Sequence, residues 1–392
     1  MKNNQQALLH MSLISGIGPA TVFKLIEHIC AQKHHQVFDF EISKLDDVLF
    51  SELYQYSKND FKSCGLSENL SHVLWQGLND TALLEQEIKL IEKYAIRIDT
   101  ILDSSYPELL RHIHQPPLVL YSKGQAFEEH AKRIAFVGSR KADEYAQQVI
   151  TALVSPLVDN GWEIVSGGAR GADSFAHQAA LDGKGKTTVV LGSGLLNPYP
   201  ELNKELFRTV FKNNGTLVSS FPLQTHPDKK TFPARNRIIA GLAQGTVIVQ
   251  AAKKSGALIT AQFALDQGRQ VFAIPGSVFN ELSYGCHALL AQGAKLVNNV
   301  YDILDEFGEK DISQHQNTQM PVEPNGVIAQ VPQPCSLTQQ EDPLLVFFQG
   351  VVTIDELSSS SGLCLAELQD KLFTLELEGK VKQNFVGSWE KN

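Results

Sequence analysis

Cysteine is scarce and scattered in this chain of 392 residues. The five cysteines are Cys30, Cys64, Cys286, Cys335 and Cys364. They form no C-x-x-C pair and no local cluster with histidine at the spacing of metal ligands. The pattern gives no indication of a metal site, and reduced thiols in a cytoplasm are expected. We predict neither a metal nor a cofactor.

Long hydrophobic runs are also absent. The N-terminal segment MKNNQQALLHMSLISGIG has one lysine and a short, broken apolar run, which is too weak for a signal peptide. No stretch approaches the length and apolarity of a membrane span. The 43% hydrophobic content is nevertheless enough to bury a sizeable core. We therefore predict a soluble, globular, cytoplasmic protein of two or three domains with no membrane contact.

Positive charge is in deficit overall, because the formal net charge is −9. That total argues against a polyanionic partner only if the charge is spread evenly. Residues 131–305 hold 18 Lys and Arg against 13 Asp and Glu, a net of +5, which leaves −14 for the rest of the chain. A mildly basic segment inside an acidic protein favours local phosphate binding.

The N-terminal residues 1–95 are predicted to form a helical domain. A turn at Gly16-Ile17-Gly18-Pro19 precedes an apolar-periodic helix, and Pro19 suits the first turn of that helix. This turn resembles a helix-hairpin-helix, whose backbone N–H groups can contact a phosphate. A helix-to-helix turn without a ligand is an equally good interpretation.

The C-terminal part is predicted to be a separate module. Residues 309–338 have the Gln-, Pro-, Asn- and Ser-rich composition of a flexible linker. Residues 339–392 are predicted to form a winged-helix-like domain, with a helix beginning at Ile354, a second over 365–377 and a strand over 380–386. The second helix carries little positive charge, which favours protein contact or packing over binding in a DNA groove.

Residues 96–308 are predicted to form a doubly wound, Rossmann-like α/β domain with a lead-in segment. The lead-in holds a short helix and an extended piece. Each of six short β-branched runs then precedes a turn and a helical stretch: RIAFVGS, WEIVSG, TTVVLGSG, TLVSSFP, GTVIVQAA and QVFAIPGS. This alternation is typical of a parallel sheet covered on both faces. Because ligands of such sheets bind at the carboxyl ends of the strands, the turns there are the candidate site.

Two of these turns are rich in glycine. The first has Gly138, Ser139 and Arg140, whose guanidinium is a planar fork that suits phosphate. In the second, S-G-G-A-R-G-A-D, three glycines free the backbone N–H groups to surround an anion. Alternatively, this turn is a structural helix start in which Arg170 pairs with Asp173. The candidate residues of the second turn are Ser166, Gly167, Gly168, Arg170 and Gly171.

A third cluster places cations beside an aromatic residue, at Lys229, Phe232, Arg235, Asn236 and Arg237. The cations suit phosphates, while Phe232 suits stacking on an unpaired base. Packing of Phe232 in the core is the competing interpretation. The turn after the fifth strand is another helix start of small residues that suits phosphate. Its candidates are Lys253, Ser255 and Gly256.

Rival chemistries lack required residues. A P-loop would need glycine where Ala180 stands, and a dinucleotide fingerprint would need one at Asn197. His177 and His287 have no Ser or Cys nucleophile elbow nearby, so structural roles are expected for both. We therefore predict a binding protein with no catalytic residue.

The ordered motifs G-S-R, S-G-G-A-R-G-A-D, F-P-A-R-N-R-I-I-A, S-G-A-L-I-T-A, Q-G-R and P-G-S resemble the DNA-processing protein A family (DprA/Smf). The resemblance implies a bacterial cytoplasmic protein that binds single-stranded DNA, forms a homodimer and loads the RecA recombinase during natural transformation. By motif position it also implies which side chains line the path of the strand: Arg140, Lys229, Phe232, Arg235 and Arg237.

Two points qualify this resemblance. Gln250 stands where the family pattern suggests an acidic residue, so no role that needs a carboxylate there is implied. Related Rossmann-like hydrolases cleave nucleoside monophosphates, and a phosphoribohydrolase of that kind is the alternative function. Their P-G-G-x-G-T-x-x-E signature is incomplete at residues 241–246, which lack the proline–glycine pair, and the glutamate is also missing.

Overall fold

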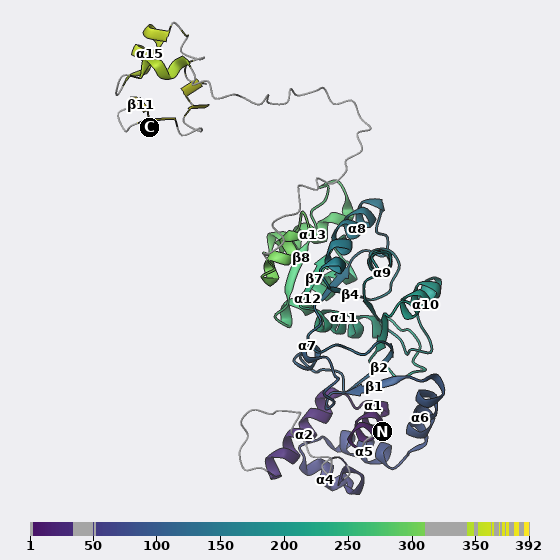
Figure 1. Cartoon of the computed structure of the whole chain (residues 1–392). Coiled ribbons are helices and arrows are strands. Elements are labelled where there is room, and N and C mark those ends of the chain that lie inside the picture. The colour runs from purple at the N-terminus through teal and green to yellow at the C-terminus, as the bar shows by residue number, and fades with distance from the viewer. Residues whose placement is uncertain are drawn as a thin grey trace. The chain divides into compact units, whose positions relative to one another are not determined.

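The computed structural model of the chain describes residues 3–33, 50, 52–309, 343–348, 352–361, 363, 368, 371–372, 374–375, 380–383 and 388–391 (Figure 1). The chain divides into two compact units, residues 1–314 and residues 315–392. Among the described helices, none combines the length and the apolarity that crossing a membrane requires.

A nine-stranded sheet forms the centre of the first unit, in the order β1-β2-β6-β5-β4-β3-β7-β8-β9. All six predicted strands are present and each pairs in parallel with its neighbours among them. The predicted doubly wound, Rossmann-like fold is therefore confirmed. The six strands are β3 (Arg133–Val137), β4 (Glu163–Ser166), β5 (Thr187–Val190), β6 (Thr216–Ser219), β7 (Gly245–Ile248) and β8 (Gln270–Ala273).

Three further strands extend this sheet at its two edges. The predicted short helix of the lead-in is α7 (Glu108–Arg111), and the predicted extended piece continues into β2 (Val119–Gly124), which pairs antiparallel with β6. The strand β1 (Arg97–Thr100) pairs antiparallel with β2, and β9 (Lys295–Leu296) pairs with β8. Neither β1 nor β9 was predicted, because two of the four residues of β1 (RIDT) are charged and β9 has only two residues.

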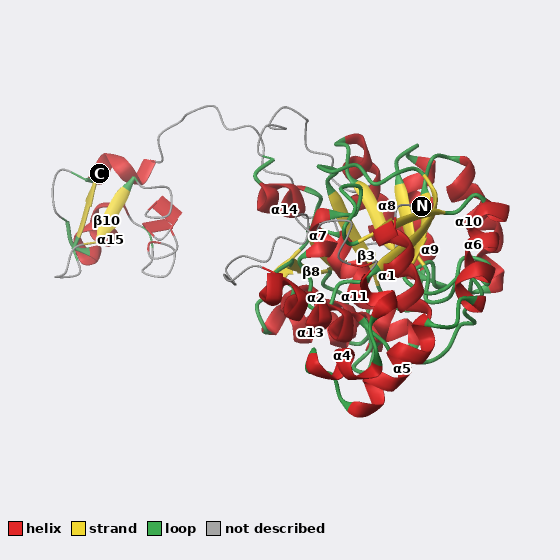
Figure 2. Ribbon diagram, turned by 90° about the horizontal axis from the view of Figure 1, so that it is seen from below, coloured by secondary structure: helices red, strands yellow, loops and turns green. Residues whose placement is uncertain are grey.

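Helices cover both faces of the sheet, as Figure 2 shows. Ile134 and Phe136 of β3 point into one core, and Ala135 and Val137 point into the other, because successive side chains of a strand face opposite sides. The first core contains α8 (Glu144–Asp159), α9 (Ala172–Asp182) and α14 (Tyr301–Leu304). The second contains α11 (Thr231–Leu242), α12 (Gly256–Asp266) and α13 (Tyr284–Ala291), while α10 (Lys204–Lys212) covers β5.

The N-terminal helices pack against the β1–β2 end of the same unit (Figure 1). The second of them begins at Pro19 after a turn in which Gly16 has a φ of +86°, as the G-I-G-P pattern predicts. Their apolar side chains join the core that contains α11 and α12. The predicted domain boundary after residue 95 therefore stays a prediction. The helices are α1 (Asn3–Leu13), α2 (Pro19–Lys33), α4 (Lys58–Ser63), α5 (Glu68–Leu78) and α6 (Ala82–Tyr94).

The second unit has a small apolar core of its own that includes Leu357, Val381 and Trp389. Its helix α15 (Ile354–Ser361) begins where the sequence predicts, and β10 (Val381–Gln383) lies within the predicted strand and pairs antiparallel with β11 (Trp389–Lys391). The winged-helix prediction stays a prediction, because much of the predicted helix 365–377 lies outside the described residues. The predicted linker also lies outside them from residue 310 onward.

Candidate nucleic-acid interface

The loops that follow the parallel strands meet at one edge of the sheet, here called the carboxyl edge. It consists of residues 138–143, 167–171, 191–200, 228–232 and 249–256. The strand β3 lies between β4 and β7, so the connections to its two sides diverge there. Such a switch point is where open α/β sheets bind ligands.

A buried arginine holds the glycine-rich loop after β4 in place. The Arg235 side chain comes from α11, is only 4% exposed, and its Nη1 donates to the backbone oxygens of Gly167 and Val190. Gly167 has no room for a side chain, because a Cβ there would overlap the Arg235 guanidinium. The sequence predicted that Arg235 lines the path of a strand. The structure places it beneath the loop, where it joins the ends of β4 and β5.

Asp173 is the charged partner of this buried arginine. It is buried on the first turn of α9, and its Oδ2 accepts from the backbone N of Ala169 at 3.2 Å. Burial lowers the pKa of Arg235 to about 10, although the negative charge of Asp173 acts in the opposite direction. Burial likewise raises the pKa of Asp173, although the positive charge of Arg235 opposes that rise. Arg235 therefore keeps its charge at neutral pH, and Asp173 lies beside it to offset that charge. The proposed alternative pair of Arg170 with Asp173 does not form among the described residues.

The two glycine-containing loops also support each other. The backbone N of Ala172 donates to the Ser139 oxygen at 3.2 Å. Gly171 has a φ of +76°, and a Cβ on it would overlap that same oxygen. The Ser166 hydroxyl donates to the Phe136 oxygen at 2.6 Å, so it holds the strands together and is turned away from a ligand.

An aromatic cluster lies at the surface between the loops after β3 and β5. The Arg140 guanidinium lies over the Phe232 ring, 5.4 Å from its centroid, and the Tyr199 ring lies 5.7 Å away at 52°. Phe232 is half-buried against Gly192, and its neighbour Thr231 donates to the Gly192 oxygen at 2.5 Å. The ring is therefore fixed at the surface by packing from below. Its stacking on a base stays a prediction.

Tyr199 was not among the predicted site residues. It is 42% exposed and follows β5 in a Pro-Tyr-Pro segment. An aromatic residue in a loop at the carboxyl end of a strand is a sequence signal that could have identified it.

Exposed cations lie in the same loops of the carboxyl edge. They form no ion pair among the described residues, although Arg140 lies over the Phe232 ring and its charge opposes the rise in the pKa of the buried Asp173. Lys141 was not singled out in the sequence, and Lys230 and Lys254 adjoin the candidates Lys229 and Lys253. The full set is Arg140, Lys141, Arg170, Lys229, Lys230, Lys253 and Lys254.

The remaining predicted residues of α11 and α12 are engaged in the fold. Arg237 Nη1 donates to the Gln115 oxygen of the lead-in at 2.5 Å, and burial lowers the pKa of Arg237. Asn236 Nδ2 donates to the Gly256 oxygen at 3.4 Å, and the Ser255 hydroxyl oxygen accepts from the N of Ala257 at 3.2 Å. The last contact caps α12 at its start.

Gln250 joins the two loops at the switch point. Its amide donates to Asp143 Oδ1 at 2.8 Å and accepts from the Asp143 backbone N at 3.3 Å. A carboxylate at position 250 would lose the first bond and repel Asp143. The departure from the family pattern therefore has a structural consequence, because the glutamine hydrogen-bonds the loop after β7 to the loop after β3.

The two histidines singled out in the sequence make structural hydrogen bonds. His177 is buried on α9 with its Nδ1 2.7 Å from the Thr187 hydroxyl, and burial lowers its pKa to about 3. His287 lies with its Nε2 3.0 Å from the Gly276 oxygen. Within the described ranges, no group of three His, Cys, Asp or Glu side chains is placed to hold a metal ion.

Comparison with known proteins gives the family of the chain. Residues 97–308, more than half of the chain, match the family described as DNA recombination-mediator protein A. DNA processing protein DprA of Bacillus subtilis is 42% identical over 218 residues, which are 55% of this chain and 73% of that protein. DNA processing protein DprA of Streptococcus pneumoniae is 41% identical over 228 residues, which are 58% of this chain and 78% of that protein.

A solved structure extends the likeness beyond the matched segment. The X-ray structure of DNA processing protein A from Streptococcus pneumoniae is 32% identical to this chain, covers 78% of it and 98% of its own length, and has a TM-score of 0.63. The family match and these relatives agree with the ordered loop motifs at the carboxyl edge. The chain belongs to the DNA recombination-mediator protein A family, whose members include the DprA and Smf proteins.

Proposed function

We propose that this protein binds single-stranded DNA along the carboxyl edge and takes part in processing incoming DNA during natural transformation. One observation carries the proposal: exposed cations that form no ion pair among the described residues share the loops of the carboxyl edge with a surface aromatic cluster. Membership of the DNA recombination-mediator protein A family supports it.

The cations account for affinity to the backbone of the strand. An unpaired lysine or arginine gains more from a phosphate than a paired one, because it loses no existing ion pair on binding. Arg140 in the loop after β3 and Arg170 within the glycine-rich loop supply planar forks, and Lys229 and Lys253 add point charges. None of these groups is positioned to read the edge of a base, so binding should depend little on sequence.

The aromatic cluster accounts for the preference for an unpaired strand. Phe232 and Tyr199 present ring surface at the edge, and an unpaired base can stack on such a surface, whereas the bases of a duplex already stack on each other. The choice of DNA over RNA rests on the family, because no residue of the edge recognises the sugar.

We also infer that the protein acts without catalysis, as a homodimer in the cytoplasm, and that it passes the bound strand to the RecA recombinase. These parts of the proposal rest on the family. The carboxylate at the switch point, Asp143, is held by Gln250 and Asn280, which leaves it poorly placed to act as a general base. A nucleotide-release assay on nucleoside monophosphates tests this point, and turnover that survives purification would contradict it.

The decisive experiment compares the full chain with its Phe232→Ala variant. Binding to oligothymidylate and to a duplex of equal length is measured by fluorescence anisotropy at two salt concentrations. We expect a single-strand preference and a loss of about 1–3 kcal/mol of single-strand binding in the variant. Phe211→Ala is the matched control, because Phe211 is an exposed phenylalanine on α10 that lies outside the carboxyl edge. Equal losses in both variants would refute the proposal.

A further inference from the structure

We propose a second base-binding subsite at the tip of the loop after β8, where one unpaired base stacks on Phe279 while its backbone passes Lys141. The inference rests on the proposed single-strand function and extends the strand beyond the Phe232 cluster.

Phe279 is the first observation. Its side chain is 92% exposed, more than any other large hydrophobic residue among those described, and its neighbour Val278 is 66% exposed. A folded protein rarely leaves two adjacent apolar side chains in water unless they contact a ligand or partner. Phe279 offers an open ring face to a planar ligand.

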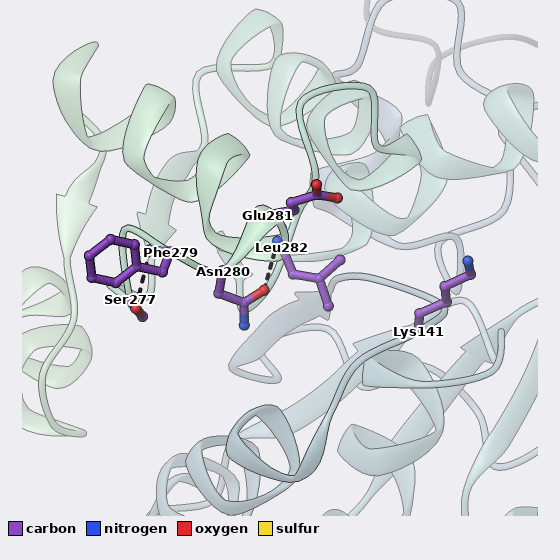
Figure 3. A pocket seen from close by; sticks show the side chains of 6 residues that line it. All are labelled: Lys141, Ser277, Phe279, Asn280, Glu281 and Leu282. Atoms are coloured by element: carbon purple, nitrogen blue, oxygen red, sulfur yellow. Dashed lines mark hydrogen bonds between the residues drawn. The ribbon is translucent and has the colours of Figure 1, made fainter.

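The loop that carries Phe279 is held in place by hydrogen bonds. The Phe279 backbone N donates to the Ser277 hydroxyl oxygen at 3.2 Å, and Asn280 Oδ1 accepts from the Leu282 N at 2.9 Å (Figure 3). The backbone of Ala251, in the loop after β7, donates to the Leu282 oxygen at 2.6 Å. The ring is therefore presented on an ordered support, which lowers the entropy lost when a base stacks on it.

The same loop is tied to the switch point. Asn280 Nδ2 donates to Asp143 Oδ2 at 3.3 Å, on the carboxylate that Gln250 also contacts. This contact joins the loops after β3, β7 and β8 into one continuous surface. The Phe279 tip therefore extends the carboxyl edge.

A shallow, open hollow lies beside Phe279. Figure 3 shows Phe279 at one end of it and Lys141 at the other, with Asn280 and Leu282 between them. Lys141 follows Arg140 directly and carries no ion pair among the described residues. Glu281 also lines the hollow and is its one acidic member, so the strand must pass on the Lys141 side.

The geometry of the sheet connects the two subsites. Tyr199 follows β5 and Phe279 follows β8, which lie four strand positions apart in the order β5-β4-β3-β7-β8. At the usual spacing this is about 19 Å, a span that requires several nucleotides. Arg140 and Lys141 after β3, with Lys253 and Lys254 after β7, lie along the way. Such a row of cations would add little to the affinity for a protein partner, whereas it matches the regularly spaced phosphates of a nucleic-acid backbone.

The test measures the affinity of the full chain for oligothymidylates of increasing length. The affinity of the wild-type chain should show a second increase with oligonucleotide length once the strand is long enough to reach Phe279. Phe279→Ala should abolish this second increase. On long strands we expect a loss of about fivefold to 100-fold, the contribution of one stacked base. On the shortest strands that bind, Phe279→Ala should match wild type, whereas Phe232→Ala should already bind weakly. Leu83→Ala, which shortens an apolar residue that is 57% exposed on the N-terminal helix α6, is the control.

Two further measurements identify the contact. Abasic oligonucleotides should bind wild type and Phe279→Ala equally, because no base is left to stack. The emission of Phe279→Trp should be quenched by long strands and not by short ones. A Phe279→Ala chain with wild-type affinity at every length would overturn the subsite. A changed oligomeric state in sedimentation with unchanged affinity would instead assign Phe279 to a protein contact.

The failure of this inference is distinguishable from failure of the proposed function. If Phe232→Ala weakens single-strand binding and Phe279→Ala does not, only the second subsite is wrong. If wild type shows no preference for single strands and Phe232→Ala has no effect, the proposed function itself is wrong.

Discussion

The two ends of the parallel strands differ in how their positive charge is paired. At the amino edge, residues 128–133, 163 and 184–187, three of the four lysine and arginine residues form ion pairs, and Lys184 forms none among the described residues. Arg133 pairs with Glu163 at 2.8 Å, and Lys186 pairs with Glu128. Lys132 likewise pairs with Glu309, at 2.6 Å. At the carboxyl edge, seven exposed cations form no ion pair within the described part of the chain, although the charge of Arg140 acts on the buried Asp173.

This difference shows why a net charge of −9 says little about the partner. A cation that is neutralised by a neighbouring carboxylate contributes little to the attraction of a polyanion, whereas an unpaired cation contributes fully. The location of the pairs decides which surface attracts phosphate. The predictions that follow test this contrast.

The largest effect is expected for the buried cation of the carboxyl edge. Arg235→Ala should lower the free energy of unfolding by about 3–5 kcal/mol, because it leaves Asp173 buried without its charged partner and two carbonyl oxygens without a donor. Urea unfolding measures the loss. Arg170→Ala, an exposed control in the same loop region, should change stability by no more than about 0.5 kcal/mol. Similar stabilities for the two variants would show that Arg235 is not structural.

A smaller effect concerns His177, which lies against Thr187 at the start of β5 near the amino edge. Thr187 already donates its hydroxyl hydrogen to the Ile164 oxygen, so His177 Nδ1 must donate to Thr187 and Nε2 is left as a bare, buried nitrogen. Protonation would place an unpartnered donor and a charge in the core. The neutral ring is therefore the folded form.

Acid should destabilise the protein through this ring. The folded pKa of about 3 lies below the ordinary value of 6.5, so below pH 6.5 the unfolded state binds a proton that the folded state does not. Stability should fall by about 1.4 kcal/mol per pH unit from this one group as the pH drops below 6.5. His177→Asn keeps a donor near Thr187 and removes the titration, so its melting temperature should fall less between pH 7.5 and 5.5. Parallel curves for the two proteins would contradict the assignment.

The smallest effect, and the most direct contrast between the edges, is the salt dependence of binding. Replacing one unpaired cation such as Lys229 with Ala should reduce the slope of log affinity against log salt by about 0.7 per lost phosphate contact. Lys186→Ala at the amino edge should leave the slope unchanged, because Lys186 is paired with Glu128. If both variants flatten the slope equally, the charge contrast between the edges does not control binding.

Much of the interface could be predicted because loops at the ends of parallel strands converge whatever their distance in the sequence. The glycines, Arg140, Lys229 and Phe232 all lie at the carboxyl edge, as the order of strands and turns predicts. The buried position of Arg235 could not be predicted, because a surface arginine and a buried arginine look alike in a sequence. Its burial depends on the space left by Gly167 and on Asp173, which is far away along the chain.

The doubly wound fold follows from the sequence alone, because each buried strand and each amphipathic helix carries its own apolar pattern. The sequence also shows which loops hold glycine and cations. Which cations form ion pairs depends on the folded molecule, since the partners come from other strands, as between Arg133 and Glu163. Only the tertiary structure revealed Tyr199 beside Phe232 and the exposed ring of Phe279, because exposure is a property of the packed molecule.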